Sequence, residues 1–540
     1  MADQEEWSSN ANEALNISFV QAGQQSPVKL STFHPKFTYP IFGEEECIFG
    51  YQGLNITIRF AAYDLLPNLS VKYDKKFKTV NDTEALNIEE TLKEWMPEVS
   101  FEPSAEFNHR IQYDTAASNW KPPGELVESY QSRGRNFEIW CADLIDPAVR
   151  QLIDHIQILI SLFIEGGTPI PLDDADWSLA KWRIFFVYEK STSLASSSTS
   201  PYSLVGYCST YRFNTYSPSV RTSPSEGKTP LTFTLPADAT TSTKPTSQET
   251  TDPNTPPFSL STLPFRARIS QFLILPSHQS HSHGTRLYQT IYTHFLHTPA
   301  CTELTVEDPN EAFDDLRDYC DYTHLLTTPT FPLLTLPTTL PPTLFAKRPG
   351  TRVPTASLLP LDRLASLRHG HKLAPRQFAR LVEMHLLSTI PPFIRASGTA
   401  RLTQKARAKG DDDRRWYYWR LLVKQRVYKR NRDVLAQLER TDRVEKCEET
   451  VGEVVGEYER LLRRMRERGG GDTMTSSERI GVEGFEGGEG KGVVNGTAAA
   501  AADTGAVRRE RGKKRKVVVE EESELEGTPE PKKVKEGAGG

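Results

Sequence analysis

The segment Arg266–Arg317 constrains the fold of this chain more than any other part of the sequence. Its predicted elements are, in order, an apolar strand (Ile269–Leu275), a turn of small and polar residues (Gln279–Gly284), an amphipathic helix (Thr285–Leu296), a second strand (Glu303–Val306) and an acidic cluster that starts at Glu307. A strand-to-helix turn presents backbone N–H groups to an anion, and a carboxylate at a strand end suits general-base catalysis. This order predicts a site that holds a phosphorylated acyl carrier beside a base and transfers its acyl group.

The surrounding sequence predicts a mixed α/β sheet. Alternating apolar residues from Leu54 to Phe60 have the period of a strand with one buried face. Further predicted elements are a helix at 86–96, a strand at Phe137–Cys141, a helix at 147–165, and strands at Trp182–Tyr188 and Ser203–Tyr211. Beyond residue 361, apolar stripes predict helices at Pro375–Leu387 and Trp416–Met465, which favour helix-to-helix packing over a dedicated partner surface.

Composition divides the 540 residues into domains. The predicted order is an α/β domain (7–130), a second α/β domain (131–326) with a Ser/Thr/Pro-rich insertion (217–263), a Pro/Thr-rich linker (327–360), a helical domain (361–467) and a basic tail (468–540). The insertion and the tail lack an apolar period, so both are predicted to be disordered.

Charge is distributed unevenly along the chain. Residues 1–325 carry a net charge of −17 and the remainder carries +12. The acidic portion favours a basic ligand such as a Lys/Arg-rich peptide, although solvation of an ordinary surface explains it equally well. In the predicted tail, the basic cluster Arg508–Lys516 and the shorter Lys532–Lys535 favour recognition by a nuclear import receptor over non-specific attraction to nucleic acid. No sequence-specific nucleic-acid binding is predicted.

Cysteine usage and hydropathy favour an intracellular protein. The six cysteines are scattered without metal-ligand spacing, which is typical of reduced thiols. The polar, acidic N-terminus does not resemble a secretory signal. The longest apolar run, Ile153–Ile164, is interrupted by His155 and Gln157, so it predicts a core helix and no membrane segment.

The turn after the first strand is the predicted phosphate site. Successive N–H groups from Gln279 to Thr285 would face one concavity, and the following helix adds the positive end of its dipole. Such turns are common in strand-to-helix connections, so this feature alone is weak. His278, His281 and His283 form a poor metal site because they crowd one turn without a fourth ligand. No metal is predicted.

Glu307 is the predicted general base because it follows an apolar strand, where a carboxylate would be partly withdrawn from water. A lysine amine must lose a proton before it attacks a thioester, and a nearby carboxylate performs that step. Asp308 would hold a water or steer a cationic substrate, and Asn310 would bind a carrier amide. The alternative is an ordinary acidic turn that caps a helix at Ala312–Tyr319.

Several segments carry a resemblance to one family. Three of them resemble the acetyl-CoA-binding core of the type B histone acetyltransferases, within the GNAT superfamily: Phe265–Ile274, Gln279–Gly284 and Thr305–Asp318. Similar stretches elsewhere are Phe42–Glu46, Phe49–Leu54 and Trp182–Lys190. The resemblance implies a GNAT core over 131–326 and transfer of acetyl from acetyl-CoA to lysines in the N-terminal tail of newly made histone H-four.

The resemblance also implies roles for individual residues. Glu307 matches the general base with Asp308 beside it, and Glu165 resembles a further active-site acid. The positions that match coenzyme contacts are Phe272, Leu273, Ile274, Gln279, Ser280, His281, Ser282, His283, Gly284, Thr285 and Asn310. The positions that match the histone-tail groove are Glu44, Glu45, Glu46, Tyr211, Arg212 and Phe213. Tyr319 and Tyr322 are candidate proton donors to the CoA thiolate by position only.

One position departs from the family. The family loop has glycine where this chain has Ser282, and a positive φ at serine would cost roughly 1 kcal/mol and weaken coenzyme binding. A non-catalytic histone-binding protein and an acetyltransferase for other amines therefore stay open as alternatives. The resemblance further implies a WD-repeat histone-binding subunit as partner, residence in nucleus and cytoplasm, and links to DNA repair and telomeric silencing.

Overall fold

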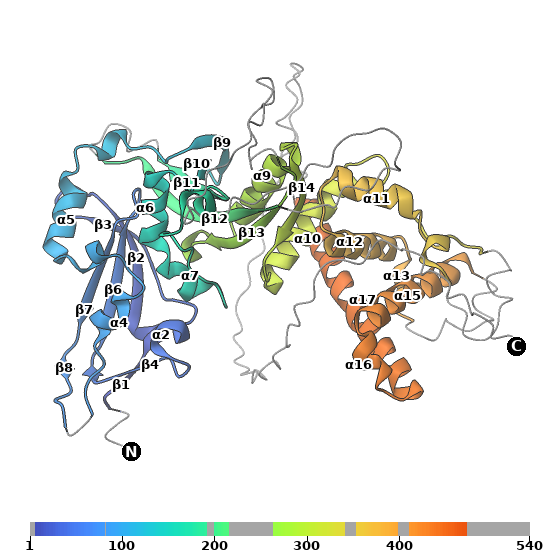
Figure 1. Ribbon diagram of the computed structural model, residues 1–540, viewed down its shortest axis with the longest axis horizontal. Helices are drawn as coiled ribbons and strands as arrows, with labels where there is room; N and C mark the ends of the chain where they lie inside the picture. The colour runs from blue at the N-terminus through green and yellow to red at the C-terminus, as the bar shows by residue number, and fades with distance from the viewer. Residues whose placement is uncertain are drawn as a thin grey trace, which may run out of the picture. The chain divides into compact units, whose positions relative to one another are not determined.

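The computed structural model describes residues 6–80, 83–191, 199–214, 263–340, 353–397 and 410–471. The cluster Arg508–Lys516, nearly all of the predicted tail and almost the whole insertion lie outside these residues. The described residues form a mixed α/β fold, as predicted (Figure 1). None of their helices combines the length and the apolar character that a bilayer crossing requires.

A six-stranded sheet carries the segment on which the sequence prediction centred. Its strands, in spatial order, are β14 (Cys301–Val306), β13 (Phe265–Ile274), β12 (Tyr202–Asn214), β11 (Trp182–Lys190), β10 (Arg135–Asp143) and β9 (Glu125–Ser132). Only β13 and β14 run parallel, and α9 (His283–His297) connects them. The helix α10 (Glu311–Leu326) follows β14 and contacts α9, so both helices lie beside this end of the sheet (Figure 1).

A second sheet forms the N-terminal domain. Its order is β3 (Val28–Phe33), β2 (Leu15–Gln21), β6 (Asn55–Ala61) and β7 (Pro67–Lys72). Two small pairs accompany it: β1 (Ser8–Asn10) with β4 (Cys47–Phe49), and β5 (Tyr51–Gln52) with β8 (Lys75–Lys76). The helices of this region are α2 (Ala11–Ala14), α3 (Tyr39–Phe42), α4 (Ile88–Lys93) and α5 (Ser104–Tyr113), with 3-10 turns at Glu98–Phe101 and Ala117–Asn119.

The helix predicted at 147–165 is interrupted. It forms α6 (Pro147–Ile156) and α7 (Ile158–Phe163), which meet at Gln157. The Gln157 side chain accepts a hydrogen bond from the Ile170 backbone N–H at 2.6 Å, so it binds the chain that returns after α7. A short helix, α8 (Asp176–Leu179), precedes β11.

The C-terminal region is helical, as predicted. Its helices are α11 (Leu361–Gly370), α12 (Pro375–Ser388), α13 (Pro392–Arg395), α15 (Asp411–Arg430), α16 (Arg432–Ala436) and α17 (Arg440–Gly471), with a 3-10 turn at Thr355–Ser357. The single long stripe predicted from Trp416 to Met465 is thus divided among α15, α16 and α17.

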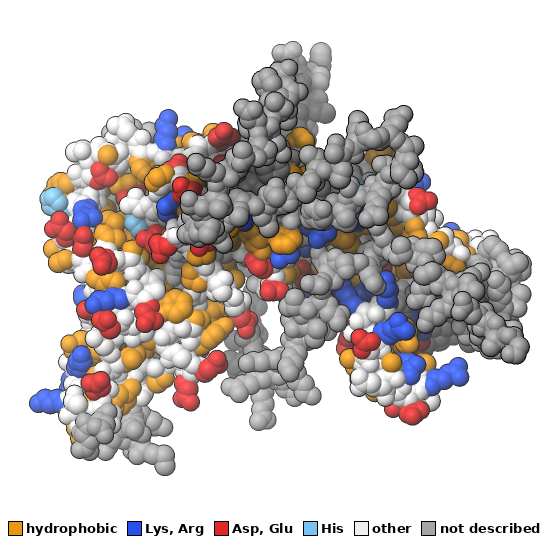
Figure 2. Space-filling view, in the orientation of Figure 1, with side chains coloured by type: hydrophobic (Ala, Val, Ile, Leu, Met, Phe, Trp, Pro, Cys, Tyr) orange, Lys and Arg blue, Asp and Glu red, His pale blue; other side chains and the backbone are white. Residues whose placement is uncertain are grey.

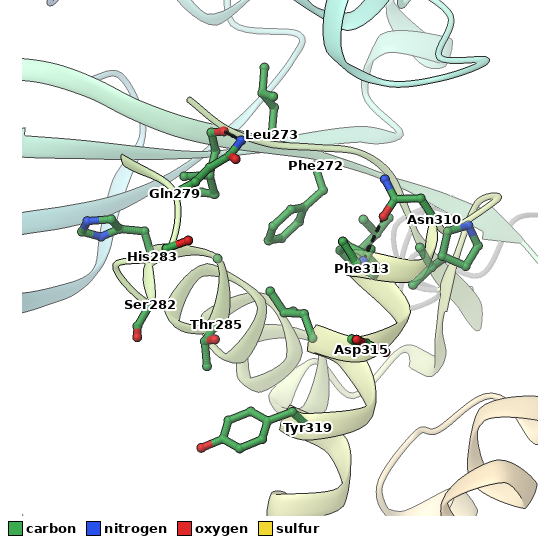
Figure 3. Close-up of a pocket in the computed structure, with 18 of the residues that line it drawn as sticks. Phe272, Leu273, Gln279, Ser282, His283, Thr285, Asn310, Phe313, Asp315 and Tyr319 are labelled. Atoms are coloured by element: carbon green, nitrogen blue, oxygen red, sulfur yellow. Dashed lines mark hydrogen bonds between the residues drawn. The ribbon is translucent and has the colours of Figure 1, made fainter. Parts of the chain in front are cut away.

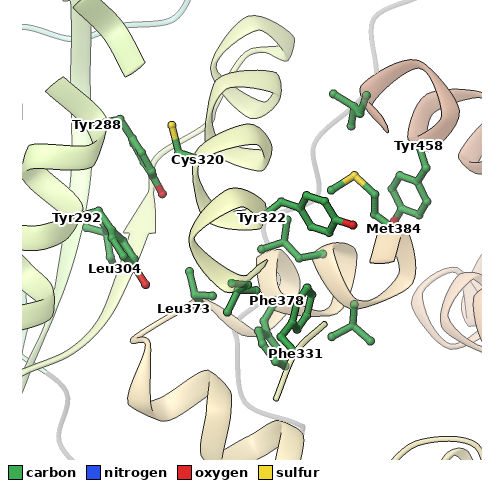
Figure 4. Close-up of a cluster of buried hydrophobic side chains, with 14 of the residues drawn as sticks. Tyr288, Tyr292, Leu304, Cys320, Tyr322, Phe331, Leu373, Phe378, Met384 and Tyr458 are labelled. Atoms are coloured by element: carbon green, nitrogen blue, oxygen red, sulfur yellow. The ribbon is translucent and has the colours of Figure 1, made fainter. Parts of the chain in front are cut away.

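Two cores bury the two faces of the six-stranded sheet. On β11, Phe185 and Val187 belong to one core, while Ile184 and Phe186 belong to the other, as the period of a strand requires. The first core continues without a break through α9 and α10 into α12, α15 and α17 (Figure 4). One face of the six-stranded sheet and the C-terminal helices therefore share one hydrophobic core.

The first described part of the predicted linker also enters this core. Phe331, Leu334 and Leu336 are buried in it, and the Phe331 ring lies against His385 of α12 at 4.7 Å. Threonine and proline dominate the sequence of this segment, but its few large apolar side chains fix it between α10 and the C-terminal helices.

Asp64, in the loop between β6 and β7, should make stability depend on pH. Burial raises the pKa of Asp64 to about 6, against about 3.9 for an unfolded chain. Because the folded protein binds this proton more tightly, the contribution of Asp64 to stability rises as the pH falls from about 7 towards 4. The variant Asp64→Asn stays neutral and still accepts the Leu66 N–H.

We therefore expect Asp64→Asn to be more stable than the native chain by about 1–2 kcal/mol at pH 8, after allowance for partial solvent screening, and by much less at pH 4.5. Urea denaturation at the two pH values measures this difference. An equal difference at both would show that Asp64 does not titrate between them.

Candidate active site

The site begins where β13 and β14 separate. The two strands pair only from Phe265 to Ile269, and the last shared hydrogen bond runs from the Glu307 N–H to the Ile269 carbonyl at 2.9 Å. On the other side of β13, the register with β12 shifts between Ser209 and Thr210, which leaves Ser270 as an extra residue in β13. A bulge of this kind reverses which residues face each edge of a strand.

The bulge decides which backbone groups face the separation. Beyond it, the Gln271 and Leu275 N–H groups point to β12, where they bind Ser209 Oγ and the Val205 carbonyl. By alternation, the backbone groups of Phe272 and Ile274 face the open edge. The Ile274 carbonyl accepts a hydrogen bond there from Gln279 Nε2 at 2.9 Å (Figure 3). The open edge thus offers the backbone groups of Phe272 and the Ile274 N–H to a ligand.

The predicted phosphate turn closes the site on one side. Ser280 and Ser282 both have positive φ, at 63° and 66°, and Ser282 immediately precedes α9 without a side-chain capping bond. Gly284 packs closely on α10, because a Cβ atom there would lie 3.1 Å from the Leu316 side chain, which would have to shift slightly. Ser282, Thr285 and the α9 N-terminus border the cavity in Figure 3, so the first-turn N–H groups are available to an anion.

Histidines surround the turn without forming a metal site. His283 is buried, bonds the Tyr130 hydroxyl at 2.8 Å and has a pKa of about 4, lowered first by burial and then by His278. Burial, and then Arg135, likewise lowers the pKa of His278 to about 4. Both rings are neutral at physiological pH. Within the described residues, no group of three or more potential ligands is placed to hold a metal ion.

Glu307 lies at the separation of the strands with its side chain exposed. The sequence predicted that this carboxylate would be partly withdrawn from water; in the protein alone it is not. Two hydroxyls orient it instead: Ser270 donates to Oε2 at 2.7 Å, and Tyr211 donates to Oε1 at 3.2 Å. Ser270 is the bulge residue, so the irregularity that opens the strand edge also positions the carboxylate.

Tyr211 connects Glu307 to the end of β12. Its pKa is raised, first by burial and then by the negative charge of Glu307, so the phenol remains a hydrogen-bond donor. Arg268 donates to the same hydroxyl at 3.4 Å. Arg212 lies over the Phe265 ring at 4.9 Å, whereas Phe213 is 51% exposed and has the Arg268 guanidinium 5.9 Å from its ring centroid.

Other predicted residues lie differently. Asp308 is exposed with φ of 34°, and Asn310 caps α10 by accepting the Phe313 N–H at 2.9 Å. Glu44 and Glu45 are exposed, but Glu46 accepts hydrogen bonds from the Thr38 and Tyr39 N–H groups and thereby caps α3. Glu165 is exposed after α7. Its neighbours Phe163 and Ile164 line the cavity, and Glu165 and His281 do not.

The cavity has a volume of about 1120 Å³ and extends further than the sequence predicted. Besides β13, the turn and α10, its wall includes Leu461, Arg464, Met465 and Glu467 of α17. Nothing in the linear sequence marks these residues, because they meet the site only through packing of α17 against α10. Of the two candidate proton donors, Tyr319 lines the cavity, whereas Tyr322 is buried in the core beside His385 (Figures 3 and 4).

The free-energy cost of a positive φ at Ser282 lowers the stability of the folded chain and does not lower its affinity for a ligand. Ser282 already adopts the left-handed conformation in the protein alone, so ligand binding need not supply that energy. We expect Ser282→Gly to stabilise the chain by up to about 1 kcal/mol and to leave CoA affinity within about twofold of the native value. Thermal denaturation and calorimetric titration with CoA test both. An affinity gain of fivefold or more would place the cost in binding.

Known proteins are similar to this chain over most of its length. The family described as "Histone acetyl transferase HAT1 N-terminus" matches residues 7–165, and "Fungal HAT1, C-terminal" matches residues 352–390. The histone acetyltransferase type B catalytic subunit of Aspergillus oryzae is 45% identical over 86% of this chain and 87% of its own length. That of Aspergillus fumigatus is 41% identical over 98% and 88%, and that of Neurospora crassa is 37% identical over 87% and 90%. The chain therefore belongs to the family of type B histone acetyltransferase catalytic subunits.

Proposed function

We propose that this histone acetyltransferase transfers the acetyl group of acetyl-CoA to lysines in the N-terminal tail of free histone H-four, with Glu307 as the general base. The observation that carries the proposal is the position of Glu307. Its carboxylate follows the last residue pair shared by β13 and β14, and its backbone N–H is fixed to Ile269. It therefore stands where the open backbone edge of Phe272 and Ile274 begins.

Each part of the cavity suits one part of the coenzyme. The Phe272 and Ile274 edge is an extended hydrogen-bonding surface for the amides of a pantetheine arm, and the α9 N-terminus suits a pyrophosphate. The cavity volume, about 1120 Å³, accommodates a ligand of this size. Asn310 does not offer its side-chain oxygen freely, because that oxygen caps α10; its amide nitrogen is the group available to a carrier amide.

The proposed reaction is a direct transfer in a ternary complex. Glu307 accepts a proton from the ammonium of the substrate lysine, and the resulting amine attacks the thioester carbonyl. The C–S bond breaks, the new amide nitrogen releases its surplus proton to water, and the thiolate takes a proton from water or from Tyr319, the candidate tyrosine on the cavity wall, which water then reprotonates. Backbone N–H groups at the open edge stabilise the charge that develops on the carbonyl oxygen.

The histone tail would enter past Tyr211 and Phe213 at the end of β12. A tail of this kind is rich in lysine, and Asp308 on the cavity wall is an exposed carboxylate that would attract it; Glu44 and Glu45 are exposed on the N-terminal domain. Acidic and basic side chains are interspersed over the face shown in Figure 2, so we attribute tail recognition to local groups more than to a broad acidic surface.

The test is incubation of the purified full-length chain with labelled acetyl-CoA and separate tail peptides from each core histone. The proposal predicts label in lysines of the histone H-four tail, with an apparent affinity lowered by salt. Retained tail binding without transfer would favour a non-catalytic histone-binding protein. Label found only in unrelated amines would favour a different acetyltransferase.

We further propose that the chain works with a WD-repeat histone-binding subunit and distributes between cytoplasm and nucleus. Histones that carry a substrate tail are largely folded, so a second subunit would hold the histone body while this chain reads the tail. The basic cluster Arg508–Lys516 would recruit an import receptor. Deleting residues 508–516 should shift a fluorescently tagged chain to the cytoplasm and leave acetylation in vitro unchanged.

A further inference from the structure

The cavity wall contributed by α17 has no role in the function proposed so far. Arg464 and Met465 line the same space as the phosphate turn, although they follow Thr285 by more than 170 residues. Met465, like Phe313 and Leu316 of α10, packs against the first hydrophobic core. Arg464 meets α10 at Asp315, about one and a half turns along the helix from Asn310.

The charges of Arg460, Arg464 and Asp315 do not cancel. Arg460 binds Asp315 of α10 in a bidentate pair at 2.6 and 2.7 Å, and Arg464 binds the same carboxylate at 2.7 Å. These arginines lower the pKa of Asp315, led by the hydrogen bonds from Arg460, so the carboxylate is ionised. Two guanidinium groups and one carboxylate leave one positive charge in excess. Arg464 holds the more exposed of the two, at 56% against 34% for Arg460.

The other cations of the wall lie in different settings. Arg286 pairs with Glu128 at 3.2 Å and stacks over the Tyr130 ring, and the nearby histidines are neutral. Lys36 is exposed on the wall and belongs to the N-terminal domain, where its backbone N–H binds the Leu162 carbonyl of α7. Glu467 lines the cavity one turn beyond Arg464 and repels an anion at its own position. Arg464 is therefore the cation that α17 contributes to the wall.

We propose that Arg464 binds the 3′-phosphate of coenzyme A and that α17 thereby completes the coenzyme site. This inference rests on the proposed function, in which the coenzyme occupies the cavity with its pyrophosphate on the α9 N-terminus. Backbone N–H groups there bind the pyrophosphate, whereas the 3′-phosphomonoester carries nearly two further charges and needs a cation. Arginine donates two parallel hydrogen bonds to a phosphate, and Asp315 holds this one towards the wall.

The test compares CoA with 3′-dephospho-CoA, which lacks only this phosphate. Calorimetric titrations use the full-length native chain, Arg464→Gln and the matched control Arg463→Gln, which removes the same charge from an exposed neighbour outside the cavity wall. We expect the native chain and the control to bind CoA roughly tenfold more tightly than 3′-dephospho-CoA. Arg464→Gln should bind both probes with the affinity that the native chain has for 3′-dephospho-CoA.

Two other outcomes overturn the assignment. If Arg464→Gln still prefers CoA as strongly as the native chain does, the 3′-phosphate lies elsewhere. If it weakens both probes equally, Arg464 acts on the pyrophosphate or on the position of α17. Failure of the native chain to bind either probe would instead contradict the proposed function. In acetylation assays, Arg464→Gln should raise KM for acetyl-CoA and leave kcat nearly unchanged, which a general loss of structure would not do.

Discussion

The variant Glu307→Gln should lower kcat for acetylation of the histone tail by roughly 100-fold or more near neutral pH. Glutamine has nearly the same shape, and its carbonyl oxygen can still accept one of the two hydrogen bonds that Ser270 and Tyr211 donate to the separate oxygens of Glu307, while its amide nitrogen faces the other hydroxyl. It cannot take a proton from an ammonium group. Steady-state kinetics should therefore show a large fall in kcat, a KM for acetyl-CoA within a fewfold of the native value, and unchanged CoA binding by calorimetry.

The matched control is Glu311→Gln, four residues later at the start of α10. It removes the same charge from an exposed position outside the cavity wall and should alter kcat by less than about twofold. The residual activity of Glu307→Gln should also rise steeply with pH, because more of the substrate amine is then deprotonated by solution. Turnover equal to that of the native chain at pH 7 would remove Glu307 from the mechanism.

The sequence predicted the position of the proposed base but not the side chains that orient it. An acidic residue at the end of an apolar strand is visible as a pattern, and so are the small residues of the turn. The bulge at Ser270 is not visible, because nothing in the composition of the run from Ile269 to Leu275 shows that one of its residues lacks a partner in β12. The contact of Tyr211 with Glu307 joins positions 96 residues apart, so it depends on strand order.

Parts of the fold escaped prediction for similar reasons. The strand β9 forms the edge of its sheet, and its adjacent apolar residues Leu126 and Val127 are both exposed, so it has no buried face for alternation to reveal. The mainly apolar run from Ile153 to Ile164 favoured one helix, whereas a single side-chain contact of Gln157 marks the break. Period and composition predict elements and faces, and they do not predict which distant residue accepts a particular hydrogen bond.

The joint between α10 and the C-terminal helices is such a set of distant contacts. Asp318 of α10 is 1% exposed and accepts hydrogen bonds from Gln377 at 3.0 Å and from Arg380 at 2.6 Å. Arg380 also donates to Glu457 of α17 at 2.6 Å. Through this network, α12 joins the helix that borders the active site to the helix that carries Arg464. The domain boundary predicted at residue 361 therefore does not separate two independently packed cores.

The variant Asp318→Ala should destabilise the chain by about 3 kcal/mol or more, because it removes the buried carboxylate shared by Gln377 and Arg380 and leaves them only Asp321 and Glu457 as partners. The matched control is Glu449→Ala, which removes an ion pair with Lys446 in which both side chains are more than half exposed, and which should cost less than about 1 kcal/mol. Thermal denaturation of both variants measures the contrast.

Because loosening of α17 also moves Arg464, Asp318→Ala should lose most of the preference for CoA over 3′-dephospho-CoA at temperatures where the sheet is still folded. Equal melting temperatures for the two variants would show that the buried network does not hold the C-terminal helices to α10.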